Sequence, residues 1–241
     1  MDADRLRMLV VDLDGTALKG RDVLVEEDLE AAARLREAGI VVTIATGRLV
    51  GGTAWVARDL GVEGSFAVMN GSARFDLDGR RLHHNALGAE TMALLDGHVR
   101  ERDLGGFLFK SHSVHLEHPH ARHRDYLAVW TDQVHASDQH DWSTDDVLAV
   151  GVVGADHQRD ALHDLAAVLR AEGALEVVAF DTFGGEPFLS VRNAHDDKGT
   201  AIEALAADRG LAVDQVVAVG DWWNDVPMLK RAGFGFAMNE A

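Results

Sequence analysis

The 241-residue sequence contains no cysteine and only three prolines. The absence of cysteine excludes disulfides, thiolate metal sites and cysteine nucleophiles. With so little proline, no long polar tract and no repeat at a fixed period, the sequence indicates neither a disordered linker nor a repeat architecture. At 47% hydrophobic residues, the chain is long enough to bury the core of one large domain or two modest ones.

Positive charge is also scarce, because 23 lysines and arginines stand against 40 acidic residues and the net charge is −17 with histidine neutral. Such a surface repels nucleic acids and anionic membranes, so we expect neither as a partner. No apolar run reaches the roughly 20 residues of a membrane-spanning helix, and the acidic N-terminus does not resemble a secretory signal. We therefore expect a cytoplasmic protein, and the sequence does not indicate its oligomeric state.

Short apolar strands alternate with amphipathic helices at both ends of the sequence. The predicted strands cover residues 8–11, 40–46, 66–69, 216–220 and 234–238. The predicted helices cover residues 26–38, 50–60, 197–210 and 224–233. This order is typical of an α/β fold with a doubly wound, Rossmann-like parallel sheet.

The middle of the chain has a different pattern and predicts an inserted α+β cap. It opens with a hairpin over residues 73–83, whose turn contains Asp78 and Gly79. Helices are predicted over residues 89–102, 120–134 and 157–172, and strands over 107–116, 147–153, 175–180 and 188–191. The expected domains are a core made of residues 1–75 and 193–241, and a cap made of residues 76–192.

Polar residues follow four of the predicted core strands where each strand ends. They are Asp12 and Asp14, Thr46 and Arg48, Asn70, and Asp221 and Asp225. The carboxyl ends of parallel strands share one edge of a sheet, and ligands bind where the strand order reverses. If the strand at 216–220 returns to lie beside the first strand, Asp12 and Asp221 face each other across that point.

Carboxylates gathered at one edge repel each other unless a cation lies among them. Ligands that offer only oxygen favour Mg²⁺, which we therefore expect as the cofactor. Lys198 stands at the start of a predicted helix, from which it can reach the same edge. An ammonium there neutralises both a carboxylate nucleophile and an incoming phosphoryl group.

The motifs DLDGT, ATGR, DKG and GDWWND occur in this order along the core. Together they resemble the four signature motifs of the haloacid dehalogenase (HAD) superfamily of aspartate-nucleophile phosphatases. The insertion after the third strand is similar to that of the C2B-capped, Cof-like subgroup (HAD-IIB). The resemblance covers essentially the whole core, while the cap resembles the family by position and element order.

The resemblance implies a role for each motif residue. Asp12 forms an aspartyl-phosphate, and Asp14 protonates the leaving alcohol and then activates water. Asp12, the backbone carbonyl of Asp14, and Asp221 hold the metal, with Asp225 in support. The implied phosphate- and substrate-binding residues are Thr46, Gly47, Arg48, Asn70, Lys198 and Asn224.

The implied function is Mg²⁺-dependent hydrolysis of a small phosphate monoester, such as a sugar phosphate or a related metabolite. A phosphosugar mutase with the same nucleophile is the first alternative, and a bisphosphorylated sugar that raised isomerisation over phosphate release would favour it. A catalytically silent protein that binds phosphometabolites is the second alternative, against which the intact acidic residues argue. A dehalogenase is disfavoured because a halide needs no acid such as Asp14.

Several residues keep more than one interpretation. Arg48 and Asn70 are predicted to contact substrate, with a purely structural role as the alternative, and Thr46 can also cap a helix. Of Trp222 and Trp223, we expect one to pack into the core and the other to line the cleft. For a set of cap residues we favour surface or structural roles over substrate contact: His112, His115, His118, His120, His123, Glu186 and Arg192.

Overall fold

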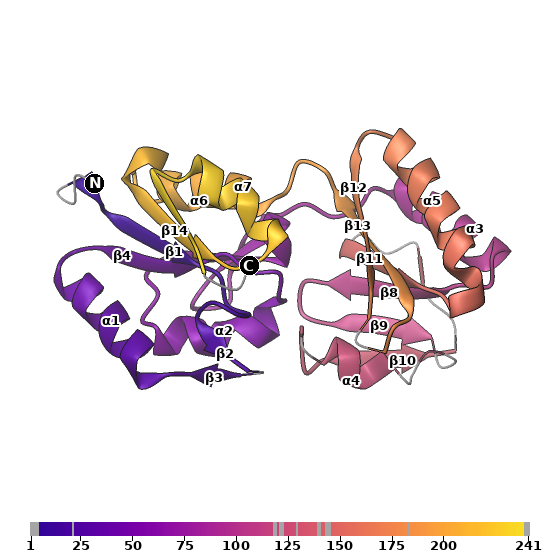
Figure 1. Cartoon of the computed structure of the whole chain (residues 1–241), viewed down its shortest axis with the longest axis horizontal. Coiled ribbons are helices and arrows are strands. Elements are labelled where there is room, and N and C mark those ends of the chain that lie inside the picture. The colour runs from indigo at the N-terminus through magenta and orange to yellow at the C-terminus, as the bar shows by residue number, and fades with distance from the viewer. Residues whose placement is uncertain are drawn as a thin grey trace. The chain divides into compact units, whose positions relative to one another are not determined.

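The computed structural model describes residues 5–20, 22–117, 120, 123–128, 130–138, 141–142, 146–182 and 184–238 (Figure 1). The chain divides into two compact units, Met1–His84 with Asp196–Ala241, and Asn85–His195. The first unit is the core and the second is the cap. Among the described residues, no helix is both long enough and apolar enough to cross a bilayer.

A parallel sheet forms the centre of the core unit. Its strands, in spatial order, are β15 (Phe234–Ala237), β14 (Val216–Gly220), β1 (Met8–Val11) and β4 (Val41–Ile44). A parallel bridge from Ala45 to Ala67 brings β5 (Ser65–Val68) beside β4. The helices of this unit are α1 (Glu26–Glu37), α2 (Val50–Asp59), α6 (Lys198–Ala207) and α7 (Val226–Arg231).

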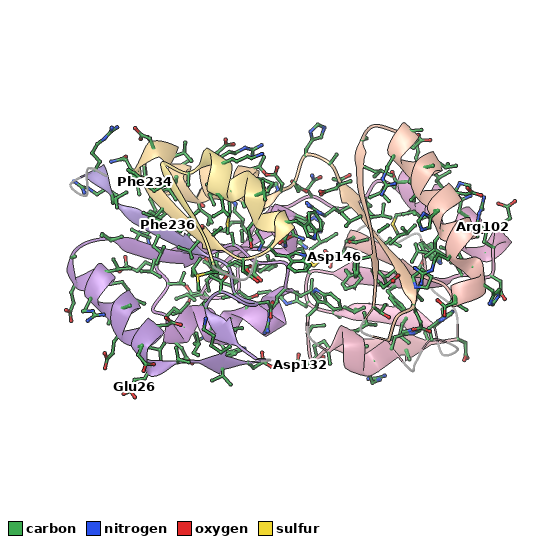
Figure 2. All side chains as sticks on the ribbon, in the orientation of Figure 1. Glu26, Arg102, Asp132, Asp146, Phe234 and Phe236 are labelled. Atoms are coloured by element: carbon green, nitrogen blue, oxygen red, sulfur yellow. The ribbon has the colours of Figure 1, made fainter. Side chains whose placement is uncertain are left out.

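The strand order reverses between β1 and β14, as the sequence pattern predicted. Met8 of β1 pairs with Val41 of β4 on one side and with Val216 of β14 on the other. The apolar side chains of β1 and β14 pack against α6 and α7 in one continuous core. β15 forms one edge of the sheet, and Phe236 is exposed on it (Figure 2). All four parallel strands therefore direct their carboxyl ends to the same edge.

Two hairpins complete the core unit. β2 (Leu18–Lys19) and β3 (Val23–Leu24) form a short one directly after β1. β6 (Ala73–Asp76) and β7 (Arg81–His84) form the second, which extends β5 as an antiparallel sheet. The second hairpin therefore lies wholly within the core unit, whereas the boundary expected at residue 76 divided it.

The cap unit is a six-stranded sheet with two long helices. The spatial strand order is β10 (Val134–Ser137), β9 (Val114–Glu117), β8 (Gly105–Lys110), β11 (Val147–Val153), β13 (Pro187–Asn193) and β12 (Leu175–Asp181). Only the pair of β9 and β10 is parallel among these strands. The helices α3 (Ala89–Glu101) and α5 (Arg159–Ala171) lie against the sheet (Figure 1). Their buried leucines close the core of this unit.

The helix predicted over residues 120–134 is wrong for most of its length. Within the described part of this segment, helix α4 covers only Arg124–Leu127, and β10 begins at Val134. The Thr131 hydroxyl donates to the carbonyl oxygen of His112 at 3.1 Å and accepts from the Gln133 N–H at 3.1 Å. Such side-chain bonds to the backbone compete with helical hydrogen bonds and favour a non-helical path into β10.

The strand predicted over residues 107–116 is two antiparallel strands, β8 and β9, joined by a turn. Phe109 pairs with Val114 across this hairpin, and the Lys110 N–H donates to the carbonyl oxygen of Ser113 at 2.8 Å. The turn coincides with the four consecutive polar residues that interrupt the apolar run, Lys110, Ser111, His112 and Ser113.

The two ends of the cap unit are tied to each other. The Asn193 side-chain amide, at the end of β13, donates to the Asn85 carbonyl oxygen, the Asn85 Oδ1 and the Ala86 carbonyl oxygen at 3.4, 3.2 and 3.0 Å. The segment that enters the cap therefore lies beside the segment that leaves it. We call this contact the cap stem.

Helix α6 begins with a side-chain cap that no other described α-helix of the core shows. Asp197 Oδ1 accepts from the Thr200 N–H at 2.6 Å, and the Thr200 hydroxyl lies 3.1 Å from the Asp197 N–H. Arg231 of α7 also donates to Asp197 Oδ1 at 3.0 Å. The cap fixes the first turn of α6, whose first residue is Lys198.

Replacing the cap residue should destabilise the core measurably. For Asp197→Ala we expect the free energy of unfolding to fall by about 1 kcal/mol, because the Thr200 N–H of the first turn and the Arg231 guanidinium lose their acceptor. The matched variant Asp197→Asn keeps a side-chain oxygen at this position, and it should lose much less. Urea denaturation of both variants checks this; equal losses would show that capping is not the main contribution.

Candidate active site

The reversal of strand order brings the predicted residues to one edge of the core sheet. Asp12 follows β1, Thr46 follows β4, Asn70 follows β5, and Asp221 follows β14. Lys198 reaches this edge from the first turn of α6. Residues up to 209 positions apart in the sequence are therefore neighbours here, because the sheet topology places the four strand ends together.

A buried lysine joins two buried carboxylates at this edge. The Lys198 ammonium donates to Asp12 Oδ1 and to Asp225 Oδ1, both at 2.5 Å. Lys198 is 1% exposed and Asp225 is fully buried. Removing Lys198 would leave two buried carboxylates without a counter-charge, and removing either carboxylate would take away one of the two partners of the ammonium, so the three residues act as one unit.

The second oxygen of Asp225 organises the turn after β14. Asp225 Oδ2 accepts from the backbone N–H groups of Asp221 and Trp222, both at 2.9 Å. A side chain at Gly220 would overlap the Asp225 carboxylate, since a Cβ there would lie 2.4 Å from Asp225 Cγ. Asp225 therefore orients both Lys198 and the backbone that carries Asp221.

Asp221 is held by the first motif. The Thr16 hydroxyl donates to Asp221 Oδ1 at 2.8 Å. Gly15 has φ +82°, and a Cβ at this residue would lie 2.1 Å from Asp221 Oδ2, so only glycine fits. Asp12, Asp221 and Asp225 each place a carboxylate oxygen within 4.8 Å of the others. This donor set consists of oxygen alone and fits a hard divalent cation.

The burial of these groups perturbs their protonation. Desolvation raises the pKa of Asp12 from its usual value to about 7; the Lys198 charge opposes this rise and the Asp225 charge adds to it. Burial alone would lower the pKa of Lys198, but the two carboxylates outweigh it, and the net direction is upward. Lys198 therefore stays charged, whereas Asp12 exchanges its proton near neutral pH.

Arg48 binds two carboxylates inside the core unit. Its Nε and Nη2 donate to the two oxygens of Asp14 at 2.9 and 2.6 Å, and its Nη1 donates to Asp22 Oδ1 at 2.7 Å. A longer bond, 3.4 Å, joins Nη1 to the carbonyl oxygen of Gly52. The Arg48 side chain is only 2% exposed, whereas those of Asp14 and Asp22 are about half exposed. We call Asp14, Arg48 and Asp22 the arginine clamp.

Thr46 and Asn70 shape the loops beside the clamp. Thr46 is fully buried, and its carbonyl oxygen accepts from the Asn70 N–H at 2.9 Å. Met69 and Asn70 both have positive φ, 47° and 55°, an uncommon conformation for residues other than glycine. The Asn224 amide donates to Asn70 Oδ1 at 2.9 Å, and Gly47 lies next to this pair. Strained backbone of this kind is concentrated at functional sites.

Neither of the adjacent tryptophans packs into the core. Trp222 is 61% exposed and Trp223 is 49% exposed. The expectation that one of them would be buried is therefore wrong. The reason lies in the turn: Asp225, not an indole, fills the space beneath the backbone of residues 221–222.

The cap histidines do not form a metal site among the residues that the structure describes. His123 is buried, with Nε2 2.6 Å from Glu186 Oε2 and Nδ1 3.1 Å from the His120 carbonyl oxygen. His112 is exposed, and His118 lies outside the described residues. Arg192 is buried and paired with Glu176. Glu186 and Arg192 thus both have structural partners within the cap.

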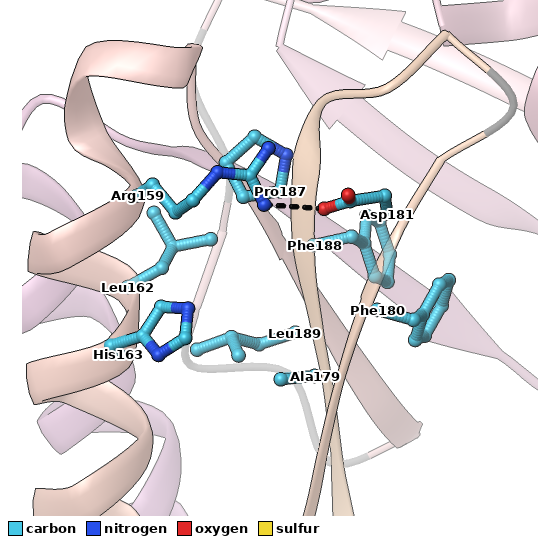
Figure 3. Close-up of a pocket in the computed structure, with 9 residues that line it drawn as sticks. All are labelled: Arg159, Leu162, His163, Ala179, Phe180, Asp181, Pro187, Phe188 and Leu189. Carbon is cyan, nitrogen blue, oxygen red and sulfur yellow. Dashed lines mark hydrogen bonds and ion pairs between the residues drawn. The ribbon is translucent and has the colours of Figure 1, made fainter.

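A hollow of about 210 Å³ lies within the cap between α5 and the strands β12 and β13 (Figure 3). Its lining is mainly apolar and aromatic, including Phe180 and Phe188, whose rings are 5.0 Å apart. Arg159 at its rim already donates to Asp181 at 2.6 Å. None of the residues predicted for catalysis lines this hollow, so it is separate from the carboxylate cluster.

The sequence interpretation missed three contributors to the site. Gly15 and Thr16 belong to the DLDGT motif but were given no role, although a glycine followed by a hydroxyl residue is a signal for a tight, hydrogen-bonded turn. Asp22 was missed because nothing in its local sequence indicates a partner 26 residues away.

Comparison with known proteins supports the same family. A profile of haloacid dehalogenase-like hydrolases matches residues 9–241. Pyridoxal phosphate phosphatase YbhA of Escherichia coli K12 is 25% identical over 245 residues, which cover 98% of this chain and 88% of that protein. The HMP-PP phosphatase of Escherichia fergusonii is 29% identical over 237 residues, covering 98% and 85%.

The fold is shared with solved structures as well. A haloacid dehalogenase-like hydrolase from Bacteroides thetaiotaomicron has a TM-score of 0.80 at 24% identity, covering 98% of this chain and 89% of that one. The predicted α/β class with a parallel, Rossmann-like sheet is thus confirmed. Because the profile spans nearly the entire sequence and includes all four motifs, this chain belongs to the family of haloacid dehalogenase-like hydrolases.

Proposed function

We propose that this protein is a Mg²⁺-dependent phosphatase that hydrolyses a small phosphate monoester through an aspartyl-phosphate on Asp12. The observation that carries the proposal is the buried Lys198 ammonium, 2.5 Å from Asp12 Oδ1, together with an Asp221 oxygen within 4.8 Å of an oxygen of Asp12. A buried cation at that place offsets the charge of the nucleophile and of the phosphoryl group in the transition state. Membership of the hydrolase family supports the same reaction class.

The reaction would proceed in two half-reactions. First, an Asp12 oxygen attacks phosphorus, the bond from phosphorus to the leaving oxygen breaks, and Asp14 supplies the proton that this oxygen takes up. Then the Asp14 carboxylate accepts a proton from water while the water oxygen attacks phosphorus and releases Asp12. Lys198 neutralises charge throughout, and Asp225 keeps Lys198 in place.

Asp12 and Asp221, with the backbone carbonyl of Asp14, are the residues we propose to hold Mg²⁺. When bound, the ion supplies positive charge to the phosphoryl oxygens. Asp225 is a supporting residue rather than a ligand, because its two oxygens already accept from Lys198 and from two backbone N–H groups. Thr46, Gly47, Asn70 and Asn224 surround the expected phosphate position at the same strand ends.

We propose a small phosphorylated metabolite as the substrate. The names of two relatives refer to pyridoxal phosphate and to HMP-PP, which supports a low-molecular-weight phosphate ester over a protein or nucleic acid. A panel of sugar phosphates and heterocyclic phosphate esters, measured by phosphate release, is the direct route to its identity.

The nucleophile can be tested by a single change. In Asp12→Asn we expect hydrolysis of p-nitrophenyl phosphate to fall by at least about 10³-fold, because an amide oxygen cannot form the phosphoenzyme. Asp59→Asn, at the exposed end of α2, is the matched control and should retain activity. Comparable turnover by Asp12→Asn and the wild-type protein would contradict the assignment.

Metal binding should depend on pH through Asp12. Its pKa of about 7 lies above that of an exposed aspartate. The metal-free fold therefore loses stability as pH rises from about 4 through 7, because the ionised form is disfavoured. Mg²⁺ binds the ionised carboxylate and competes with the proton, so its apparent affinity should weaken up to about tenfold per pH unit below 7 and level off above.

This dependence can be measured from the rise in melting temperature on titration with MgCl₂ between pH 5.5 and 8.5. The same titration on Asp12→Asn provides the comparison, because the variant has no proton to displace at this position. An Mg²⁺ affinity of the wild-type protein that did not change over this range would contradict competition between the ion and a proton on Asp12 near pH 7.

A further inference from the structure

We propose that Arg48 is a positioning residue for Asp14 and not a ligand of the phosphoryl group, and that Asp22 shares this task by holding the guanidinium from its other side. The inference rests on the proposed function, because it assumes that Asp14 is the proton donor and acceptor. It differs from the sequence expectation, which placed Arg48 among the substrate-binding residues.

The hydrogen bonds of Arg48 leave little capacity for a ligand. Each of its three guanidinium nitrogens already donates to an oxygen of the core unit: Nε and Nη2 to Asp14, and Nη1 to Asp22. A phosphoryl oxygen would therefore have to displace a carboxylate from a bidentate pair whose guanidinium is buried. Such pairs are the strongest and most directional that arginine makes.

The backbone of Arg48 is equally fixed. Its N–H donates to the Thr46 hydroxyl at 3.1 Å, and its carbonyl oxygen accepts from the Met69 N–H at 2.9 Å. The loops that follow β4 and β5 thus hold Arg48 from both sides. Arg48 is a fixed, buried donor, and its two bonds restrict the rotamers of the more exposed Asp14 carboxylate. Supporting residues in active sites act in this way.

Asp22 adds the third point of the clamp. It precedes β3 in the β2–β3 hairpin, and its bond to Nη1 spans 2.7 Å. Burial alone would lower the pKa of Arg48, but the carboxylates of Asp14 and Asp22 outweigh this effect and raise it. Arg48 therefore stays charged. The clamp therefore ties both the hairpin and Asp14 to the loop after β4.

Leaving-group dependence separates a positioning role from phosphate binding. A p-nitrophenolate leaves without help, whereas an alkoxide needs a proton from Asp14 as its bond to phosphorus breaks. Misplacing Asp14 should therefore slow phosphoenzyme formation from p-nitrobenzyl phosphate far more than from p-nitrophenyl phosphate. Loss of a phosphate ligand would instead weaken binding of both substrates alike.

The main test is Arg48→Lys, which keeps the charge but loses the bidentate geometry. We expect kcat/KM to fall about 10²-fold for p-nitrobenzyl phosphate and less than about fivefold for p-nitrophenyl phosphate. The inhibition constant of inorganic phosphate should change less than about threefold. With p-nitrophenyl phosphate, a burst of product should appear, because hydrolysis of the phosphoenzyme also needs Asp14.

A double-mutant cycle tests whether Arg48 acts through Asp14. Asp14→Asn should show the same leaving-group bias, and adding Arg48→Lys to it should cause little further loss of kcat/KM. Additive losses would overturn the inference. A lack of bias in Asp14→Asn itself would instead refute the acid–base role within the proposed function, so the two failures are distinguishable.

A second variant, Asp22→Ala, tests the same inference if Arg48→Lys does not fold. Asp22→Ala removes an exposed side chain and frees one side of the guanidinium. It should lower the melting temperature only moderately, because Arg48 keeps both bonds to Asp14, and it should lower kcat/KM for p-nitrobenzyl phosphate about threefold, with a smaller loss for p-nitrophenyl phosphate. An equal loss for both substrates, no change for either, or a raised inhibition constant for phosphate would overturn the proposal.

Discussion

The arrangement at the strand ends depends on the contact of the Lys198 ammonium with Asp12 and Asp225. Burying two carboxylates side by side is unfavourable, and only a cation in direct contact makes it possible in this space. Lys198 supplies that charge from the first residue of α6, so the capping of this helix by Asp197 also positions the ammonium. Asp225 extends the same interaction to the backbone that carries Asp221. A single ion-pair network thus links helix α6, strand β1 and the turn after β14.

Most of the core architecture could be predicted from the sequence, because its signals are local. The apolar runs of β1 and β14 have the predicted bounds, and α2 ends within one residue of its expected end. The described residues after 120 were less predictable, because two bonds made by Thr131 favour a non-helical path just before β10. One of these bonds reaches His112, 19 residues earlier in the sequence, and no local pattern connects the two residues.

The candidate site shows the same division between local and distant signals. The grouping of Asp12, Lys198 and Asp221 followed from one assumption about strand order, which the sheet topology satisfies. The partners of Arg48 did not follow, since Asp14 and Asp22 were only two of many acidic residues available to it. The packing of the surrounding side chains determines which of several acidic residues pairs with a buried arginine.

The cap stem has a consequence for how the chain assembles. Because Asn193 binds Asn85 and Ala86, the folded cap brings its own ends together and connects the two parts of the core as a short bridge would. Once the cap has folded, a much shorter effective loop separates Asp12 from Lys198. Each halving of this loop lowers the entropic cost of forming their contact by only roughly 0.6 kcal/mol. An insert with joined ends can be lengthened, shortened or exchanged between relatives without moving the strands on either side of it. The stem thus makes the distance that the chain spans between the two parts of the core independent of the length of the cap.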